Sequence, residues 1–140
     1  MKKATPLITV DAIEPCLAFW TDGLGFELDA TVPHEDSIGF AMLHKGDVGL
    51  MYQSRASVEA DLGASGAPDG LAGDMARGTA ALFVEVEDLD AVIAGIGDAQ
   101  VVVPRRETFY GMDEIFVRAP CGTVLGFAQK VEGADEESGD

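Results

Sequence analysis

Long apolar segments are missing from this chain. No apolar run in its 140 residues approaches the ~20 residues that a membrane-spanning helix needs. Residues 1–6 contain two lysines but neither a continuous apolar region nor a small-residue cleavage site. We therefore expect a protein without a signal peptide or membrane segment, located in the cytoplasm.

Basic residues are scarce, whereas acidic residues are abundant. Nine Lys and Arg stand against 25 Asp and Glu, which gives a formal net charge of −16. Nucleic acids and anionic lipids are bound through Lys and Arg, so this charge argues against both as partners. The acidic field would concentrate a cationic small molecule. Solubility or adaptation to high salt explains the same charge at least as well.

Residues that could bind metals or act as nucleophiles are also few. Two cysteines, Cys16 and Cys121, are too few for a disulfide framework. The two histidines, His34 and His44, fall in a predicted turn and at the end of a predicted strand, where solvated side chains are expected. The chain has no Gly-x-Ser-x-Gly motif, no phosphate-binding glycine loop and no Cys–His pairing. We assign no catalytic residue.

What the chain does contain is an internal repeat. Residues 7–26 predict a strand, then an amphipathic helix that starts near Asp11 and is ended by Gly23 in a left-handed conformation. The segment 84–97 matches the first strand and helix after a shift of 76 positions, so that Leu17 falls on Ile93. A chain that repeats at half its length predicts two copies of one βαβββ unit.

The remaining pattern fits two such modules, 1–62 and 79–130. We expect a glycine-rich, mobile linker at 63–78 and an acidic disordered tail at 131–140. Period-2 alternation and turn residues predict strands at 26–32, 37–44, 48–53, 79–86, 100–105, 113–118 and 123–129, with helices at 54–62 and 88–96.

Three segments resemble one protein family. LAFWTDGLGF (17–26), VEVEDLDAVI (84–93) and MDEIFVRAPCGTVLGFAQ (112–129), in this order, resemble the glyoxalase / bleomycin-resistance / extradiol-dioxygenase superfamily, also called vicinal oxygen chelate proteins. The resemblance implies an α+β fold in which two βαβββ modules with curled mixed sheets form a concave cavity. In many members a homodimer completes the site.

The resemblance also bears on metal binding. Metal-dependent members carry His, Glu or Gln ligands at four places, where this chain has Thr5, Leu50, Ala81 and Gly126. A slip of one position brings in Met51 or Phe127, which are no better as ligands. We therefore expect no metal ion and no cofactor. An alternative stays open: a metal-dependent glyoxalase- or dioxygenase-type lyase or oxygenase with a substrate-borne or unusual metal site.

Among the branches of this superfamily, the chain is most similar to the metal-free bleomycin-resistance type, which sequesters a drug without altering it. This implies an aromatic and/or cationic ligand, with a glycopeptide antibiotic as one candidate, in a groove completed by a homodimer. An interaction module without a small ligand is a further alternative.

The same resemblance supplies the ligand-binding candidates. It places Phe40 and Tyr110 in the groove, and Met51, Phe109 and Phe116 are candidates by proximity in the sequence. Phe40 and Phe116 lie in strands and could instead face the core, so Tyr110 in its turn is the strongest candidate. Acidic side chains that could steer a cation are Glu35, Asp36, Glu107 and Asp113.

Overall fold

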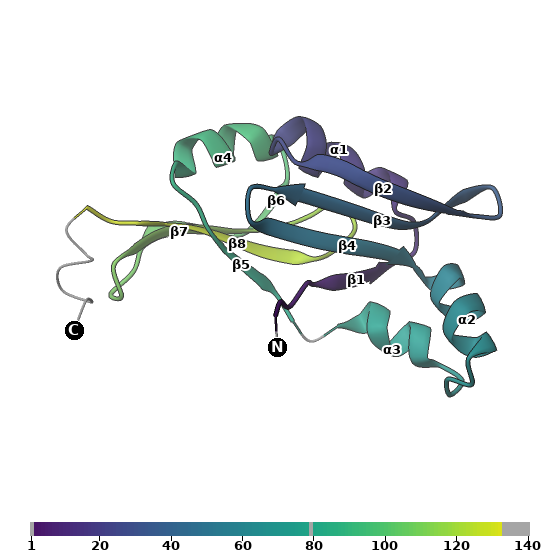
Figure 1. The fold of residues 1–140 in the computed structure, drawn as a ribbon. Helices are drawn as coiled ribbons and strands as arrows, with labels where there is room; N and C mark the ends of the chain where they lie inside the picture. The colour runs from purple at the N-terminus through teal and green to yellow at the C-terminus, as the bar shows by residue number, and fades with distance from the viewer. Residues whose placement is uncertain (1, 79, 133–140) are drawn as a thin grey trace. The chain divides into compact units, whose positions relative to one another are not determined.

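The computed structural model describes residues 2–78 and 80–132. It divides into two compact units, Met1–Thr79 and Ala80–Asp140, which are described one at a time (Figure 1). Each unit is built on one four-stranded mixed sheet, so the predicted α+β fold with a repeated βαβββ module is confirmed. None of the helices in the described part is both long and apolar enough to cross a bilayer.

The first unit consists of a βαβββ module followed by two helices. Its elements are β1 (Leu7–Val10), α1 (Glu14–Ala18), the π-helical turn η1 (Phe19–Gly23), β2 (Glu27–His34), β3 (Ser37–Lys45), β4 (Val48–Ser54), α2 (Arg55–Ala64) and α3 (Leu71–Arg77). The sheet has the order β1-β4-β3-β2. Strand β1 runs parallel to β4, whereas the other neighbours are antiparallel.

The core of the first unit lies on the sheet face that meets η1. Leu50 and Tyr52 alternate along β4, pair with buried residues of β3 and are themselves buried. Trp20 in η1 is buried as well, and its indole Nε1 donates a hydrogen bond of 2.7 Å to the Tyr52 hydroxyl. Alternation along β4 therefore directs Met51 and Gln53 to the opposite face.

The ends of the first helical segment differ from the prediction. The helix begins at Glu14 after Ile13, which makes no side-chain cap, and Asp11 plays no capping role. Gly25, not Gly23, has a left-handed backbone, with φ of +77°. Pro15 fits this start, because it lies in the first turn, where proline is tolerated since the N–H has no intrahelical partner.

The segment 63–78, expected to be a linker, contains the helix α3. A turn with left-handed Gly66 and Gly70 separates it from α2. The side chain of Ser54 caps α2 by accepting a hydrogen bond from the Ser57 N–H at 3.2 Å. The first unit therefore extends through this glycine-rich stretch to residue 79.

The second unit repeats the module. Its elements are β5 (Leu82–Glu85), α4 (Leu89–Ile96), β6 (Gln100–Glu107), β7 (Met112–Arg118) and β8 (Val124–Lys130). The order β5-β8-β7-β6, with β5 parallel to β8, matches that of the first sheet. Residues 133–140 of the expected acidic tail lie outside the described residues.

The core of the second unit lies between α4 and one face of its sheet. Leu89, Ile115, Val117 and Leu125 are among its buried side chains. Asp88 caps α4 by accepting from the Ala91 N–H at 3.1 Å. A glutamine on β8 accepts a 2.7 Å hydrogen bond from the first N–H of the helix, which fixes α4 on the sheet. The remaining face of the sheet carries the side chains considered next.

Candidate functional site

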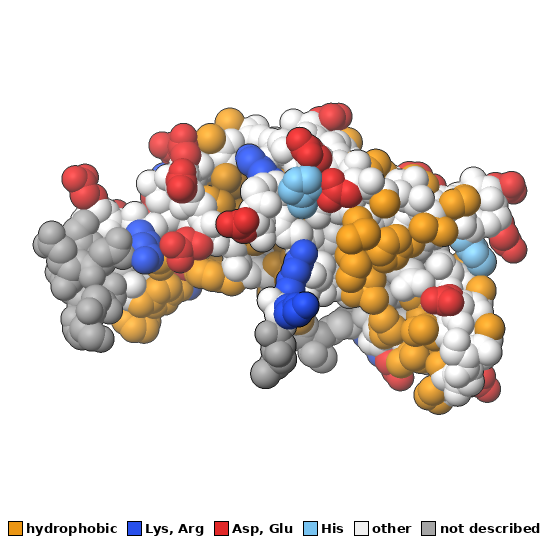
Figure 2. All heavy atoms as spheres, in the orientation of Figure 1, with side chains coloured by type: hydrophobic (Ala, Val, Ile, Leu, Met, Phe, Trp, Pro, Cys, Tyr) orange, Lys and Arg blue, Asp and Glu red, His pale blue; other side chains and the backbone are white. Residues whose placement is uncertain are grey.

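The open face of the first sheet is apolar. Phe40 and Met42 on β3 lie on the face opposite to Leu50 and Tyr52, and Met42 pairs with Met51 across the strands. Figure 2 shows hydrophobic side chains gathered over the region where Figure 1 draws β3 and β4. We define the apolar face by strand register as Leu7, Val32, Phe40, Met42 and Met51.

These side chains are accessible to a ligand. Leu7 is 40% exposed, Val32 53% and Met42 38%, whereas Phe40 and Met51 are half-buried. The structure therefore brings the predicted residues Phe40 and Met51 to one face of one sheet. Sequence reasoning did not include Leu7, Val32 and Met42 among the candidates, although the alternation along β3 already grouped Met42 with Phe40.

The donor atoms on this face do not fit the divalent cation that many family members hold. Leu50 is buried in the core instead of facing outward. The open face of β1 and β4 offers the cross-strand pair Thr9 and Gln53, a hydroxyl and an amide without imidazole or carboxylate. Thr9 Oγ1 is buried and, within residues 2–78 and 80–132, has no hydrogen-bond partner.

The corresponding face of the second sheet offers two carboxylates in register and no imidazole. Glu85 on β5 and Glu114 on β7 both pair with Ala128 of β8. Glu114 already accepts hydrogen bonds from Arg106 and Tyr110, and a divalent cation needs several available ligands. The residues of each unit, taken by itself, therefore do not support the metal site that the family implies.

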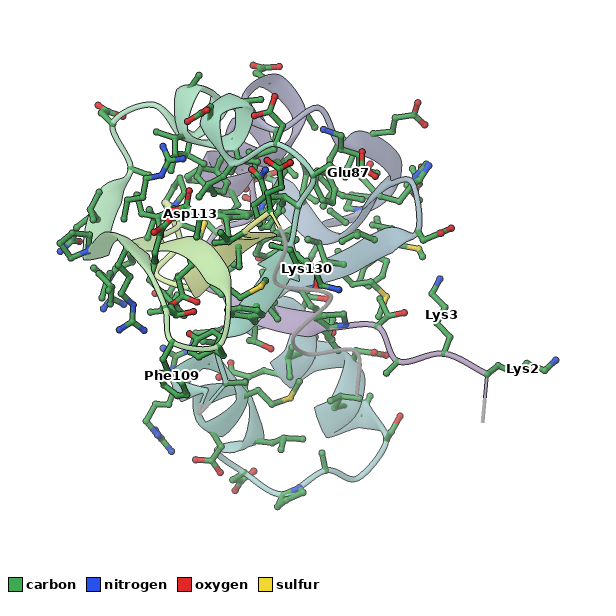
Figure 3. All side chains as sticks on the ribbon, turned by 90° about the vertical axis from the view of Figure 1, so that its left-hand side faces the viewer. Lys2, Lys3, Glu87, Phe109, Asp113 and Lys130 are labelled. Carbon is green, nitrogen blue, oxygen red and sulfur yellow. The ribbon has the colours of Figure 1, made fainter. Side chains whose placement is uncertain are left out.

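Two predicted aromatic residues form the turn between β6 and β7. Phe109 is fully exposed, and Tyr110 is 46% exposed. Their rings lie 5.0 Å apart in an edge-to-face arrangement, and Figure 3 shows Phe109 at this turn. The turn thus presents two rings to solvent, a geometry suited to stacking on a flat ligand.

A buried carboxylate lies beneath Tyr110. Glu114 on β7 has no exposed surface, and its Oε1 accepts a 2.7 Å hydrogen bond from the Tyr110 hydroxyl. Its Oε2 accepts from Nε and Nη2 of Arg106 at 3.3 and 3.0 Å. The bond to Glu114 raises the pKa of Tyr110, because it stabilises the protonated phenol. The hydrogen bond from Arg106 to Glu114 likewise raises the pKa of Arg106.

Sequence reasoning missed this network. The cross-strand register pairs Arg106 with Glu114 and Glu107 with Asp113. The spacing of the two strands around the turn is the signal that could have identified the partners. Tyr110 was predicted, but its hydrogen bond to a buried acid was not.

Phe116 does not belong to the core beneath α4. It shares a face with Glu114 two residues away, and its ring crosses Gly126 so closely that a Cβ there would lie 2.6 Å from Phe116 Cε2. The ring of Phe83, which is 53% exposed, lies 6.2 Å away. Phe116 is therefore half-buried on the open face of the second sheet.

Among the acidic candidates, Asp113 already has a cationic partner. Arg105 donates to it at 2.9 Å and to Asp90 at 2.8 Å. Glu35, with a φ of 53°, and Asp36 occupy the turn between β2 and β3. Asp113, labelled in Figure 3, is thus paired with an arginine that it shares with Asp90.

Comparisons with known proteins agree with this architecture. The model of the Glyoxalase/Bleomycin resistance protein/Dioxygenase superfamily matches residues 4–127. A glyoxalase/bleomycin resistance protein/dioxygenase from Nocardioides has a similar structure, with a TM-score of 0.65, 18% identity, and coverage of 95% of this chain and 87% of that one.

Two further similar structures are described by what they bind. One is TnmS3, an antibiotic binding protein from Streptomyces sp. CB03234, with a TM-score of 0.61, 20% identity, and coverage of 93% and 98% of the two chains. The other is the bleomycin-binding protein of Streptomyces verticillus in complex with copper(II)-bleomycin. Its TM-score is 0.56 and its sequence identity 23%, and the match covers 91% of this chain and 94% of that one. None of the curated proteins compared matches. The chain belongs to the glyoxalase/bleomycin resistance protein/dioxygenase superfamily.

Proposed function

We propose that this chain is a binding protein that sequesters an aromatic and/or cationic small molecule without altering it. The observation that carries the proposal is the apolar face of the first sheet, defined above. Exposed apolar side chains that share one face typically mark a binding surface. A homodimer that completes the groove is part of the proposal.

The chemistry of the two open faces supports a binder. Small-molecule sites are mostly apolar, with a few polar groups that fix the ligand's orientation. Met42 and Met51 offer flexible thioethers that adapt to ring systems. In the second unit Tyr110 and Phe109 offer ring faces, and an aromatic pair contributes about 0.5–1.5 kcal/mol beyond area burial. Similar folds include proteins described as binding bleomycin or an antibiotic.

The donor chemistry of the open faces supports binding more than metal-dependent catalysis. A Lewis-acid mechanism needs a cation held by several imidazole or carboxylate ligands. The cross-strand pair Thr9 and Gln53 supplies neither type of ligand. Stoichiometric metal that co-purifies and is required for turnover would favour the enzyme alternative instead.

The test is calorimetric titration of the protein with bleomycin and with a panel of smaller aromatic cations. Fluorescence of Trp20 is a poor readout, because this side chain is 1% exposed and contacts the covered face of the sheet. We expect one ligand of the panel to bind. Failure of every compound would favour an interaction module without a small ligand.

Substitutions at two similarly exposed positions test the location of the site. Met42, 38% exposed, belongs to the apolar face, whereas Val48, 41% exposed, lies on the other side of the sheet at the start of β4. Met42→Glu should weaken binding at least tenfold, and Val48→Glu should leave it unchanged. Equal effects of the two substitutions would contradict the proposed location.

The aromatic turn is tested separately. Tyr110→Ala should weaken binding by at least tenfold, because it removes a ring face that the turn presents to solvent. Tyr110→Phe, which keeps the ring, should retain most of the affinity. A Tyr110→Ala variant that binds as the wild type does would exclude this turn from the site. Sedimentation or light scattering measures whether the ligand-binding species is a dimer.

A further inference from the structure

A cluster of potential metal ligands lies at the start of β2 and the end of β3, away from the positions that the family resemblance gives for metal ligands. Within the described part of the chain, Glu27, Asp29 and His44 form the one group of three such side chains whose ligand atoms all lie within 4.8 Å of one another. Glu27 and His44 are cross-strand partners, and a register irregularity between Leu28 and Ala30 places Asp29 beside them.

The contacts of His44 determine which ring nitrogen is available. Its Nδ1 lies 2.8 Å from both carboxylate oxygens of Asp29. A carboxylate accepts but cannot donate when ionised, so Nδ1 carries the hydrogen and Nε2 carries the lone pair in the neutral ring. Carboxylates commonly orient metal-binding histidines in this way and raise their basicity.

The other ring nitrogen, Nε2, faces a second carboxylate. His44 Nε2 lies 3.6 Å from Glu27 Oε2. Two donor atoms that each lie about 2.1 Å from an ion at the tetrahedral angle are themselves about 3.4 Å apart. The observed separation is therefore close to the one that a shared ion needs, and it is longer than a direct hydrogen bond.

We propose that His44 Nε2 and Glu27 bind a divalent transition-metal ion and that Asp29 holds the imidazole in the required tautomer. Imidazole combined with carboxylate suits Zn²⁺, Cu²⁺ and Ni²⁺ better than Mg²⁺ or Ca²⁺. The three side chains are 42%, 76% and 40% exposed, so water fills the other coordination positions. The net charge of −16 raises the local concentration of cations. The proposal stands on these three residues and does not depend on the proposed function.

The chain provides a matched control for the test. His34 is the second of its two histidines, at the end of β2 beside the turn to β3 and outside the cluster. Untagged, chelator-treated full-length protein is titrated with Zn²⁺ and with Ni²⁺ in the presence of excess Mg²⁺. We expect one saturable site, weakened at least tenfold by His44→Gln and unchanged by His34→Gln. Asp29→Asn should weaken it by about 10–100-fold.

Nitrogen-detected NMR of the histidine rings gives a second readout. Zn²⁺ should shift Nε2 of His44, while Nδ1 keeps its hydrogen. Equal effects of the two His→Gln variants, the absence of a saturable site, or ligation through Nδ1 would each overturn the assignment. Circular dichroism verifies that the variants are folded. Titration of His44→Gln with metal-free organic ligands separates failure of this site from failure of the proposed function.

Discussion

The buried hydrogen bond between Trp20 and Tyr52 should be a major determinant of stability in the first unit. The indole Nε1 donates to the phenol at 2.7 Å, and the two side chains are 1% and 0% exposed. Tyr52→Phe removes one oxygen atom and leaves the shape of the core almost unchanged. The indole N–H then stays buried without its acceptor.

The expected cost follows from that orphaned donor. A buried polar group left without its partner costs about 1–3 kcal/mol of folding free energy. Because Trp20 is almost completely buried, we expect about 2 kcal/mol, in the middle of that range. Urea unfolding followed by the emission of the single tryptophan measures the change directly.

The same pair makes a prediction about alkaline pH. Burial raises the pKa of Tyr52 to about 12, and the hydrogen bond from Trp20 offsets part of that rise. The neutral phenol is therefore favoured in the folded state, so its contribution is complete below pH about 10 and is lost as pH rises through about 12. A shift of this size corresponds to roughly 2–3 kcal/mol.

A comparison of the two tyrosines provides the control. The pKa of Tyr110 is also raised, by its bond to Glu114. Both tyrosines therefore stabilise the folded state while they are protonated, and both lose that contribution as the pH rises. Tyr52→Phe should remove most of the alkaline loss of stability, and Tyr110→Phe a smaller part. If Tyr52→Phe unfolds at the same urea concentration as the wild type and shows the same alkaline profile, the hydrogen bond does not stabilise the unit and the reasoning fails.

Two further substitutions probe the second unit. Gly126→Ala should lower the free energy of unfolding by about 1–3 kcal/mol, because a Cβ there would lie 2.6 Å from the Phe116 ring. Thermal unfolding measures this change, and an unchanged midpoint would show that the ring moves freely. Arg106→Met should lower the urea midpoint of unfolding more than Arg105→Met does. The carboxylate that pairs with Arg106, Glu114, has no exposed surface, whereas Arg105 pairs with exposed or half-exposed acids. Equal shifts in midpoint would mean that burial of the carboxylate does not matter.

Much of the fold could be predicted from the sequence because the constraints are local. Period-2 alternation located the strands to within a few residues, and the repeat with a shift of 76 predicted two modules of one topology. The helix α3 was missed because glycine-rich composition argues against helices. Packing beside α2 in the same unit outweighs that preference (Figure 1).

Which of the two alternating sets of side chains in a strand is buried was harder to predict. Alternation in β4 separates Leu50 and Tyr52 from Met51, but it does not say which set is buried. A shift of one residue exchanges the two faces of a strand. In this structure Leu50 and Tyr52 form the buried set, and Tyr52 meets Trp20, a partner 32 positions away, on the covered face. The expected metal position Leu50 therefore lies in the core, and Met51 lies on the open face.

The buried acid was missed for a related reason. Nothing near Glu114 in the sequence marks it as buried, since 25 acidic residues are present and most acidic side chains are exposed. Its burial depends on Arg106 in the neighbouring strand and on Tyr110 in the turn. Such a network becomes visible only when the register of β6 and β7 is known.

The two units show how one topology can present different chemistry. Both sheets have the same strand order, and in each a helical segment covers one face. Packing constrains the residues on those covered faces. The open faces differ between the units, with an apolar face in the first unit and an aromatic and ionic network around Glu114 in the second. Function in this superfamily fold must therefore be argued from the open faces, since the shared topology is compatible with binding and with catalysis alike.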